Sequence, residues 1–184
     1  MTASLKYDTI TTTIERIYIM TELSDIIKET IAEQIIPKVE WQKAKYLKIK
    51  QASTTEKGRF GENLIVNILK KLEFAIEIID GGVGDFDTLL NNLTKMEHKT
   101  ATIDVGGCFQ FNAIKKGNID YDLVFCLGVS YDKMYFEIIS KQFVEDYLTT
   151  NMTKAGGGFK YTSNPSKMQE LTLQNLKETV AKIV

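Results

Sequence analysis

The sequence predicts a mixed α/β fold in which a β-sheet is flanked by helices. Three observations support this. Apolar residues recur first at helical spacing, then in short runs typical of strands, and then at helical spacing again. Polar or glycine-rich turns separate the apolar runs. The 184 residues, 43% of them hydrophobic and 26% charged, are enough to bury one sizeable core without disulfides or metals.

The N-terminal part, about residues 1–52, is expected to be helical. Apolar residues at helical intervals predict helices over residues 14–35 and 38–50, with Pro37 interrupting between them. A third helix should begin at Ser53, because Ser53 and Glu56 form a capping-box pattern ahead of an apolar stripe. Gly61 in this helix costs about 1 kcal/mol of helix propensity relative to alanine, which indicates close backbone packing there.

The core of this single predicted domain, about residues 53–148, should contain the sheet. The apolar runs predict strands at residues 74–80, 85–90, 94–100, 122–129 and 134–139. The short polar turn between the second and third strands favours a β-hairpin. Residues 109–116 fit either a short helix or an irregular crossover. Helices are expected at residues 141–148 and 168–183, the second with a capping box at Ser166 and Gln169, so that residues 149–184 form a loop and a helix.

Composition excludes several classes of protein. The net charge of −1 argues against a strong nonspecific nucleic-acid binder, but it leaves room for an enzyme whose carboxylates are neutralised by a metal. Cys108 and Cys126 form neither a disulfide framework nor a zinc site, and we expect both to be small core residues. We read neither a signal peptide nor a membrane span, so no membrane partner and a cytoplasmic location are expected.

Chemistry-bearing side chains gather on the predicted hairpin. Strand alternation puts Glu97 and Lys99 on one face and turns His98, the only histidine, to the other. Asp85 and Asp87 share a face of the preceding strand. If the two strands pair, these carboxylates can hold a hard cation such as Mg²⁺, which prefers oxygen ligands. A lysine on the same face can hold a water or offset the charge of a phosphate.

The segments GRFGEN, GDFD, MEHKT, FQFNAI and YDLVFCLGV, over about residues 53–140, resemble the PD-(D/E)XK nuclease superfamily. Within it the chain looks like the small type II restriction endonucleases. The resemblance implies a restriction-endonuclease-like fold and a catalytic set that maps onto Glu62, Asp87, Glu97 and Lys99. The superfamily's proline before the aspartate is absent, so Asp85 and Asp87 are alternative principal metal ligands, with Asp87 preferred. Gln110 matches a polar residue that often follows the lysine strand, and is either a site residue or a surface amide.

The resemblance implies a Mg²⁺-dependent endonuclease, with Mn²⁺ able to substitute, that cuts double-stranded DNA at a short site as a homodimer. The alternatives are a junction-resolving or repair nuclease of the same fold, or a non-catalytic DNA-binding module. The helices of residues 14–50 are candidates for dimerisation and groove contacts. The run of glycines at residues 156–158 is either a flexible loop or a DNA-contacting one. The basic residues expected to bind DNA are Lys57, Arg59, Lys154 and Lys160.

Overall fold

The computed structural model describes residues 39–79, 85–151, 154–155 and 157–183. The chain divides into two compact units, Met1–Gln42 and Lys43–Val184. Of the first unit, only helix α2 (Val39–Gln42) is described. The helix predicted at residues 14–35 and the glycine-rich turn at residues 81–84 lie outside the described residues, so the predictions made for them stay predictions. The expectation of a single domain over residues 1–184 likewise stays a prediction.

The second unit begins with two helices. The single helix predicted over residues 38–50 is wrong: after α2 the helical structure stops, and α3 (Leu47–Gln51) begins afresh. One reason is that the Tyr46 amide donates to the carbonyl of Tyr131 instead of to a helical carbonyl. Helix α4 (Thr54–Lys71) confirms the capping box: Ser53 Oγ accepts from the Glu56 amide, and the Glu56 carboxylate accepts from the Ser53 amide.

Nine described strands form two sheets. The larger sheet has the order β1-β2-β3-β5-β6-β9, and the smaller has the order β4-β8-β7. Only the β3–β5 pair is parallel; every other described pair is antiparallel. The strands of the larger sheet are β1 (Ile76–Ile78), β2 (Thr88–Leu90), β3 (Thr94–Thr102), β5 (Leu123–Val129), β6 (Met134–Ser140) and β9 (Gln169–Glu170). Those of the smaller sheet are β4 (Phe109–Ile114), β7 (Lys154–Ala155) and β8 (Gly158–Ser163).

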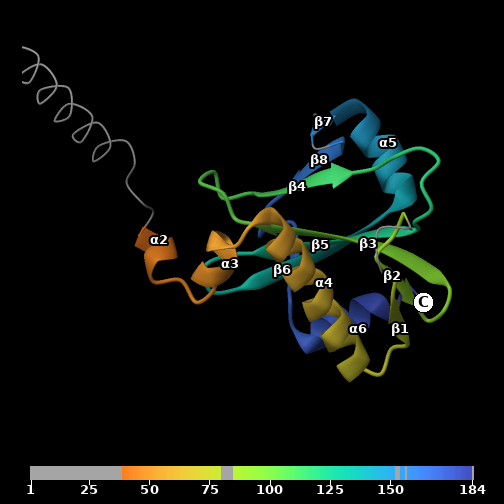
Figure 1. Cartoon of the computed structure of the whole chain (residues 1–184), viewed down its shortest axis with the longest axis horizontal. Coiled ribbons are helices and arrows are strands. Elements are labelled where there is room, and N and C mark those ends of the chain that lie inside the picture. Colours follow the sequence, from red (N-terminus) through yellow and green to blue (C-terminus); the bar gives the residue numbers. More distant parts are fainter. Residues whose placement is uncertain (1–38, 80–84, 152–153, 156, 184) are drawn as a thin grey trace, which may run out of the picture. The chain divides into compact units, whose positions relative to one another are not determined.

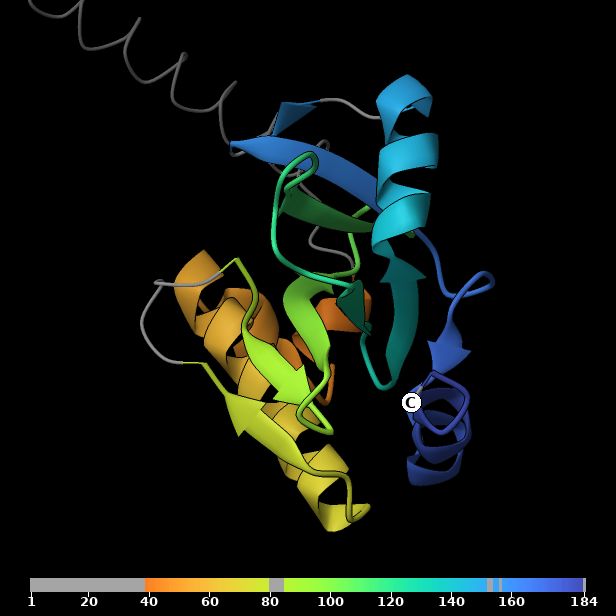
Figure 2. The same cartoon turned by 90° about the vertical axis from the view of Figure 1, so that its right-hand side faces the viewer.

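The two faces of the larger sheet are covered differently (Figure 1). Helices α4 and α6 (Leu173–Val180) pack on one face, where Ile65, Leu69, Phe125 and Leu176 are among the fully buried core residues. The smaller sheet lies over the other face, with α5 (Lys141–Asn151) beside it (Figure 2). The predicted mixed sheet flanked by helices is therefore confirmed, and the smaller sheet is an addition to it.

Two glycines allow these layers to approach closely. A Cβ on Gly61 of α4 would lie 1.8 Å from Thr100 Oγ1 of β3, so the close backbone packing predicted there is confirmed. On the opposite face, a Cβ on Gly128 of β5 would lie 2.7 Å from the ring of Phe109 on β4. Both contacts fix their partner elements against β3 and β5, which are the central strands.

Several local predictions are wrong. Residues 109–116 form neither a helix nor a crossover, because β4 pairs with β8. The helix predicted at residues 168–183 begins only at α6, capped by Thr172, since Gln169 belongs to β9 and Ser166 instead donates to Asn164. Within the glycine run at residues 156–158, Gly158 belongs to β8, and the DNA contact expected of the run stays a prediction.

Two further adjustments concern the hairpin and the cysteines. The strand predicted from residue 85 begins at Thr88, although the β2–β3 hairpin itself is confirmed. Cys126 is buried, but Cys108 is partly exposed in a tight turn around Asp104 rather than in the core. No helix within the described ranges is long and apolar enough to cross a membrane.

Candidate active site

Asp87 is held at the start of the hairpin by three hydrogen bonds. Its amide donates to the carbonyl of Met96 at 2.9 Å, and its own carbonyl accepts from the amide of Ile79 at 2.9 Å. Its side chain crosses to β3, where Oδ2 accepts from the His98 amide at 2.6 Å. These bonds place the Asp87 carboxylate next to Glu97, the residue between Met96 and His98. A carboxylate has several acceptor positions, so this bond leaves Asp87 able to bind a further donor or a cation.

Glu97 and Lys99 form an ion pair on the same face of β3. Their side chains are only 13% and 18% exposed, so the pair is largely shielded from water. Burial raises the pKa of the Glu97 carboxyl, the charges of Lys99 and Lys115 oppose that rise, and the charge of Asp87 adds to it. Two neighbouring carboxylates in a shielded site repel one another, and a cation between them would relieve that repulsion.

His98 points to the helix side of the sheet, and the prediction that it faces away from Glu97 and Lys99 is confirmed. Its ring stacks on Phe125, a member of the core beneath α4, with centroids 5.7 Å apart. Nε2 lies 2.8 Å from Thr88 Oγ1, while Nδ1 is buried with no hydrogen-bond partner among the described residues. Burial lowers the pKa of His98 to about 4, against the charge of Asp87, so the ring is neutral near pH 7. A neutral ring wedged in the core is consistent with the expectation that His98 is not catalytic.

Asp85 lies in a different environment from Asp87. Its Oδ2 accepts from the amide of Asp120 at 3.2 Å, and its Oδ1 lies 4.0 Å from Nζ of Lys115. Its side chain is 39% exposed. Asp85 therefore contacts the loop before β5, whereas Asp87 contacts β3 beside Glu97.

A polar cleft of about 560 Å³ opens beside Lys99. It runs from the first turns of α4, across β3, to the exposed edge of β4. The residues that line it are Thr54, Gly58, His98, Lys99, Thr100, Gln110, Asn112 and Ala113. This cleft gives the Glu97–Lys99 pair a neighbouring space large enough for part of a substrate.

Three of the predicted DNA-binding residues, Lys57, Arg59 and Lys160, belong to the elements on either side of this cleft. On α4, Lys57 lies between the cleft residues Thr54 and Gly58, and exposed Arg59 directly follows Gly58. Burial lowers the pKa of Lys50, and the charge of nearby Lys57 lowers it further. Lys160 of β8 donates to Gln110 Oε1 at 3.4 Å. Lys154 pairs through its backbone with Phe159 at the far end of the smaller sheet.

Two other residues assigned to the site by resemblance, Gln110 and Glu62, belong to elements outside the β2–β3 hairpin. Gln110 lines the polar cleft, but its amide donates to Asp104 Oδ2 at 2.5 Å. Glu62 belongs to α4, which packs on the opposite face of the sheet from Glu97 through its neighbour Gly61. The role of Glu62 stays a prediction.

The donor set fits a cation held jointly with a substrate. Within the described ranges, no group of three or more His, Cys, Asp or Glu side chains is arranged to hold a metal by itself. Mg²⁺, however, is commonly bound through one or two carboxylates, with water and phosphate oxygens completing its shell. The adjacent pair Asp87 and Glu97, with the raised pKa of Glu97, matches that requirement rather than a closed protein cage.

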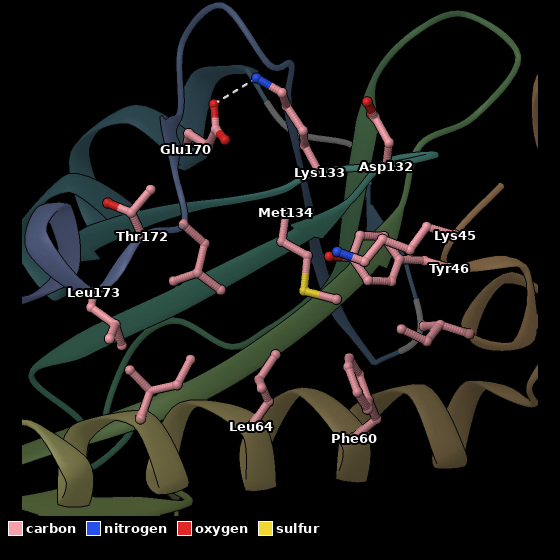
Figure 3. Close-up of a pocket in the computed structure, with 13 residues that line it drawn as sticks. Lys45, Tyr46, Phe60, Leu64, Asp132, Lys133, Met134, Glu170, Thr172 and Leu173 are labelled. Atoms are coloured by element: carbon pink, nitrogen blue, oxygen red, sulfur yellow. Dashed lines mark hydrogen bonds and ion pairs between the residues drawn. The ribbon is translucent and has the colours of Figure 1, made fainter.

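A second cavity, of about 610 Å³, lies on another side of α4 (Figure 3). Its walls are mainly apolar, with Phe60 and Leu64 of α4 facing Met134 of β6 and Leu173 of α6. An ion pair between Lys133 and Glu170, 2.8 Å long, lies at its rim. None of the residues predicted to carry chemistry lines this apolar cleft.

Sequence reasoning missed residues on β4 and on the segment after it. Lys115 acts electrostatically on Glu97 and lies near Asp85, and Tyr121 Oη donates to the Lys115 carbonyl at 2.5 Å. Asn112 lines the polar cleft. The one available signal was the pair Lys115-Lys116 directly after residues 109–114. Because those residues were not recognised as a strand, the sequence did not show where in the fold the two lysines lie.

Comparisons with known proteins give limited information. No protein-family model matches the chain, and no curated protein matches it. Seven chains of solved structures match. One is the structure of a bacterial homing endonuclease, at a TM-score of 0.48 and 13% identity, covering 72% of this chain and 91% of that chain.

Proposed function

We propose that the chain is a metal-dependent endonuclease of the PD-(D/E)XK class that hydrolyses phosphodiester bonds of double-stranded DNA. One observation carries the proposal. The Asp87 carboxylate is hydrogen-bonded across the hairpin beside Glu97, and Glu97 is paired with Lys99 at the edge of a polar cleft. Two carboxylates and a lysine beside an open cleft are the groups that metal-assisted phosphodiester hydrolysis needs.

In this proposal Asp87 and Glu97 hold Mg²⁺, or Mn²⁺ in its place, together with water and a phosphate oxygen. The bound ion supplies stabilisation of negative charge in the transition state and lowers the pKa of the attacking water. Lys99 counteracts the effect of burial on Glu97, and so favours the charged carboxylate. Lys99 also lines the cleft, so its ammonium could orient a water or offset the charge of the phosphate there.

Asp87 is the preferred metal ligand over Asp85 for an electrostatic reason. The charge of Asp87 raises the pKa of Glu97, which means that the two carboxylates share one electrostatic environment. Asp85 is instead occupied by the Asp120 amide and lies near Lys115. A cation at Glu97 would therefore gain most from Asp87.

Duplex DNA is the proposed substrate because basic groups flank the cleft on both sides. Lys57 and Arg59 are on the α4 side and Lys160 is on the β8 side, so phosphates on either flank of a scissile bond could be contacted. Gln110 and Asn112 supply amide groups between them. The finer proposal is a type II restriction endonuclease, which cuts both strands of a short site as a homodimer.

A plasmid cleavage assay with Mg²⁺, with Mn²⁺ and with a chelator tests the proposal. The parent should cut only with metal, and Asp87→Asn should reduce cutting by at least about a thousandfold, a barrier increase of about 4 kcal/mol. Asp132→Asn, at the apolar cleft, is the matched control and should cut like the parent. Discrete bands from plasmid support restriction, and cutting of branched DNA alone indicates a resolving nuclease. DNA binding without any cutting indicates a non-catalytic module.

Light scattering tests the finer proposal separately. The chain should have the mass of a dimer, free or bound to duplex DNA. A monomer mass in both states would contradict the restriction proposal while leaving the proposed chemistry intact, because one active site can still nick one strand.

A further inference from the structure

Lys115 brings a positive charge close to the carboxylates from the segment that follows β4 of the smaller sheet. It follows β4 directly, and its Nζ lies 4.0 Å from Oδ1 of Asp85. Its charge also lowers the pKa of Glu97, against the larger effect of burial. We propose that Lys115 is a substrate-binding residue that contacts a DNA phosphate beside Asp87 and Glu97. This inference rests on the nuclease function proposed above.

A bulge directs the chain toward the site. The register between β4 and β8 shifts between Phe111 and Ile114, and Ala113 has a φ of 59°, which is rare for a residue with a side chain. A Cβ on Gly158 would lie 2.6 Å from the Ile114 carbonyl oxygen, so β8 holds the bulge closely. Bulges of this kind change the direction of the side chains that follow them, and they are frequent beside active sites.

The backbone of Lys115 is fixed after the bulge. Tyr121, which is 2% exposed, donates its hydroxyl to the Lys115 carbonyl at 2.5 Å. The Gly117 amide, two residues on, donates to Glu145 Oε1 of α5 at 2.6 Å. Only the side chain of Lys115 therefore remains to be ordered when it binds a ligand, which lowers the entropic cost of that contact.

Lys115 is better placed than Lys99 to meet an incoming phosphate. Lys99 is enclosed and paired with Glu97, whereas the Lys115 side chain is 50% exposed. Its partner Asp85 is also half-exposed, and ion pairs of that kind contribute little stability, so exchanging Asp85 for a phosphate costs little. A phosphate brought next to two carboxylates needs a nearby cation, and Lys115 can supply it.

The test is the salt dependence of DNA binding by the full chain in a chelator, measured by fluorescence anisotropy with a plasmid-derived duplex. Lys115→Ala should reduce the slope of log affinity against log salt by about 0.9, which corresponds to about eightfold weaker binding at 0.1 M salt. Lys115→Arg should restore both the slope and the affinity of the parent. The matched control is Lys116→Ala, because the ammonium of Lys116 lies over the Phe159 ring, 4.9 Å from its centroid. It should keep the slope of the parent.

The outcomes separate this inference from the proposed function. A parent that cuts DNA with metal, together with a Lys115→Ala slope equal to that of Lys116→Ala, overturns the role of Lys115 alone. A parent that neither binds nor cuts DNA overturns both proposals. Lys115→Met, which keeps the length of the side chain, should show the same reduced slope as Lys115→Ala. A parental slope in Lys115→Met would mean that the alanine variant acted through the fold.

Discussion

The two clefts beside α4 have similar volumes and opposite chemistry. The polar cleft, about 560 Å³, uses Thr54 and Gly58 from the start of the helix, and the apolar cleft, about 610 Å³, uses Phe60, Leu64 and Ile68. The polar cleft adjoins an ion pair that is largely shielded from water, whereas the ion pair at the apolar cleft, Lys133–Glu170, is half-exposed. Cleft size alone therefore does not locate the chemistry. The proposed function instead uses charged groups held in a shielded place, because water screens their interactions least there.

The largest expected effect comes from the carboxylates and lysine beside the polar cleft. Glu97→Ala, Asp87→Asn and Lys99→Ala should each reduce metal-dependent plasmid cleavage by orders of magnitude. Without metal, Glu97→Ala and Asp87→Asn remove repulsion of phosphate, so DNA binding should hold or tighten. Lys99→Ala removes a positive charge, so metal-free binding should weaken. Gel shifts in a chelator, paired with the cleavage assay, measure both.

Two outcomes would count against these roles in different ways. Near-parental cleavage by all three variants would show that the active-site assignment is wrong. Lost cleavage without the opposite shifts in metal-free binding would keep the site but remove the roles given to Glu97 and Lys99. Glu170→Gln, at the apolar cleft, is the control for a lost carboxylate.

The next effect concerns the free energy of unfolding, which depends on the close packing of α4 against β3 beside the polar cleft. Gly61→Ala puts a Cβ 1.8 Å from Thr100 Oγ1 and 3.2 Å from Leu127, and it should destabilise the fold by about 1–3 kcal/mol. Gly58→Ala, one turn earlier, meets no atom within 4 Å and should stabilise the helix by up to about 1 kcal/mol. Urea unfolding of both variants measures the difference. Equal stabilities would show that α4 and β3 are not packed this closely.

His98→Ala should separate stability from catalysis. The neutral ring is favoured in the folded chain because burial lowers the pKa of His98 to about 4, from an ordinary value of 6.5. Its contribution is therefore complete above pH 6.5 and is lost as pH falls toward 4. The variant should unfold with less pH dependence between those values, as followed by thermal melts. Its cleavage should stay within about tenfold of the parent, below roughly 1.4 kcal/mol in the barrier.

A loss of cleavage of a thousandfold or more in His98→Ala, with the fold intact by circular dichroism, would contradict the assignment of His98 to the helix side of β3. It would also show that His98, which lines the polar cleft, takes part in the reaction from there.

The smallest effect is expected at the apolar cleft. Lys133→Gln breaks an ion pair that water already screens, so both cleavage and DNA affinity should equal those of the parent. The same cleavage and anisotropy assays measure this. A large loss in either would mean that the apolar cleft belongs to the functional surface, and the contrast between the two clefts would then be wrong.

Sequence reasoning succeeded where the controlling interactions are local. The Ser53–Glu56 capping box depends on hydrogen bonds within four residues, and it was confirmed. The β2–β3 hairpin depends on a short turn between two runs, and the opposite faces of Glu97 and His98 follow from strand alternation. These features need no partner far away in the chain.

Sequence reasoning failed where a distant partner decides. β4 is a strand because it pairs with β8, about fifty residues later, and α6 starts late because Gln169 pairs with Phe136. Gln110 contacts Asp104 instead of the carboxylates because the turn before β4 presents that acid to it. The two alternatives expected for residues 109–116, a short helix and an irregular crossover, both missed the strand, because a short apolar run does not separate helix from strand by its local pattern.

The sequence by itself determined the main secondary-structure pattern, the hairpin, and the placing of Glu97 and Lys99 on one strand of it with Asp87 directly before the other. Only the tertiary structure decided the surroundings of those groups: Asp87 rather than Asp85 bonds to β3 beside Glu97, and Lys115, directly after β4, lies near Asp85 and acts electrostatically on Glu97. The physical reason is that alternation and capping act over a few residues, whereas the charge environment of a carboxylate depends on every element folded around it.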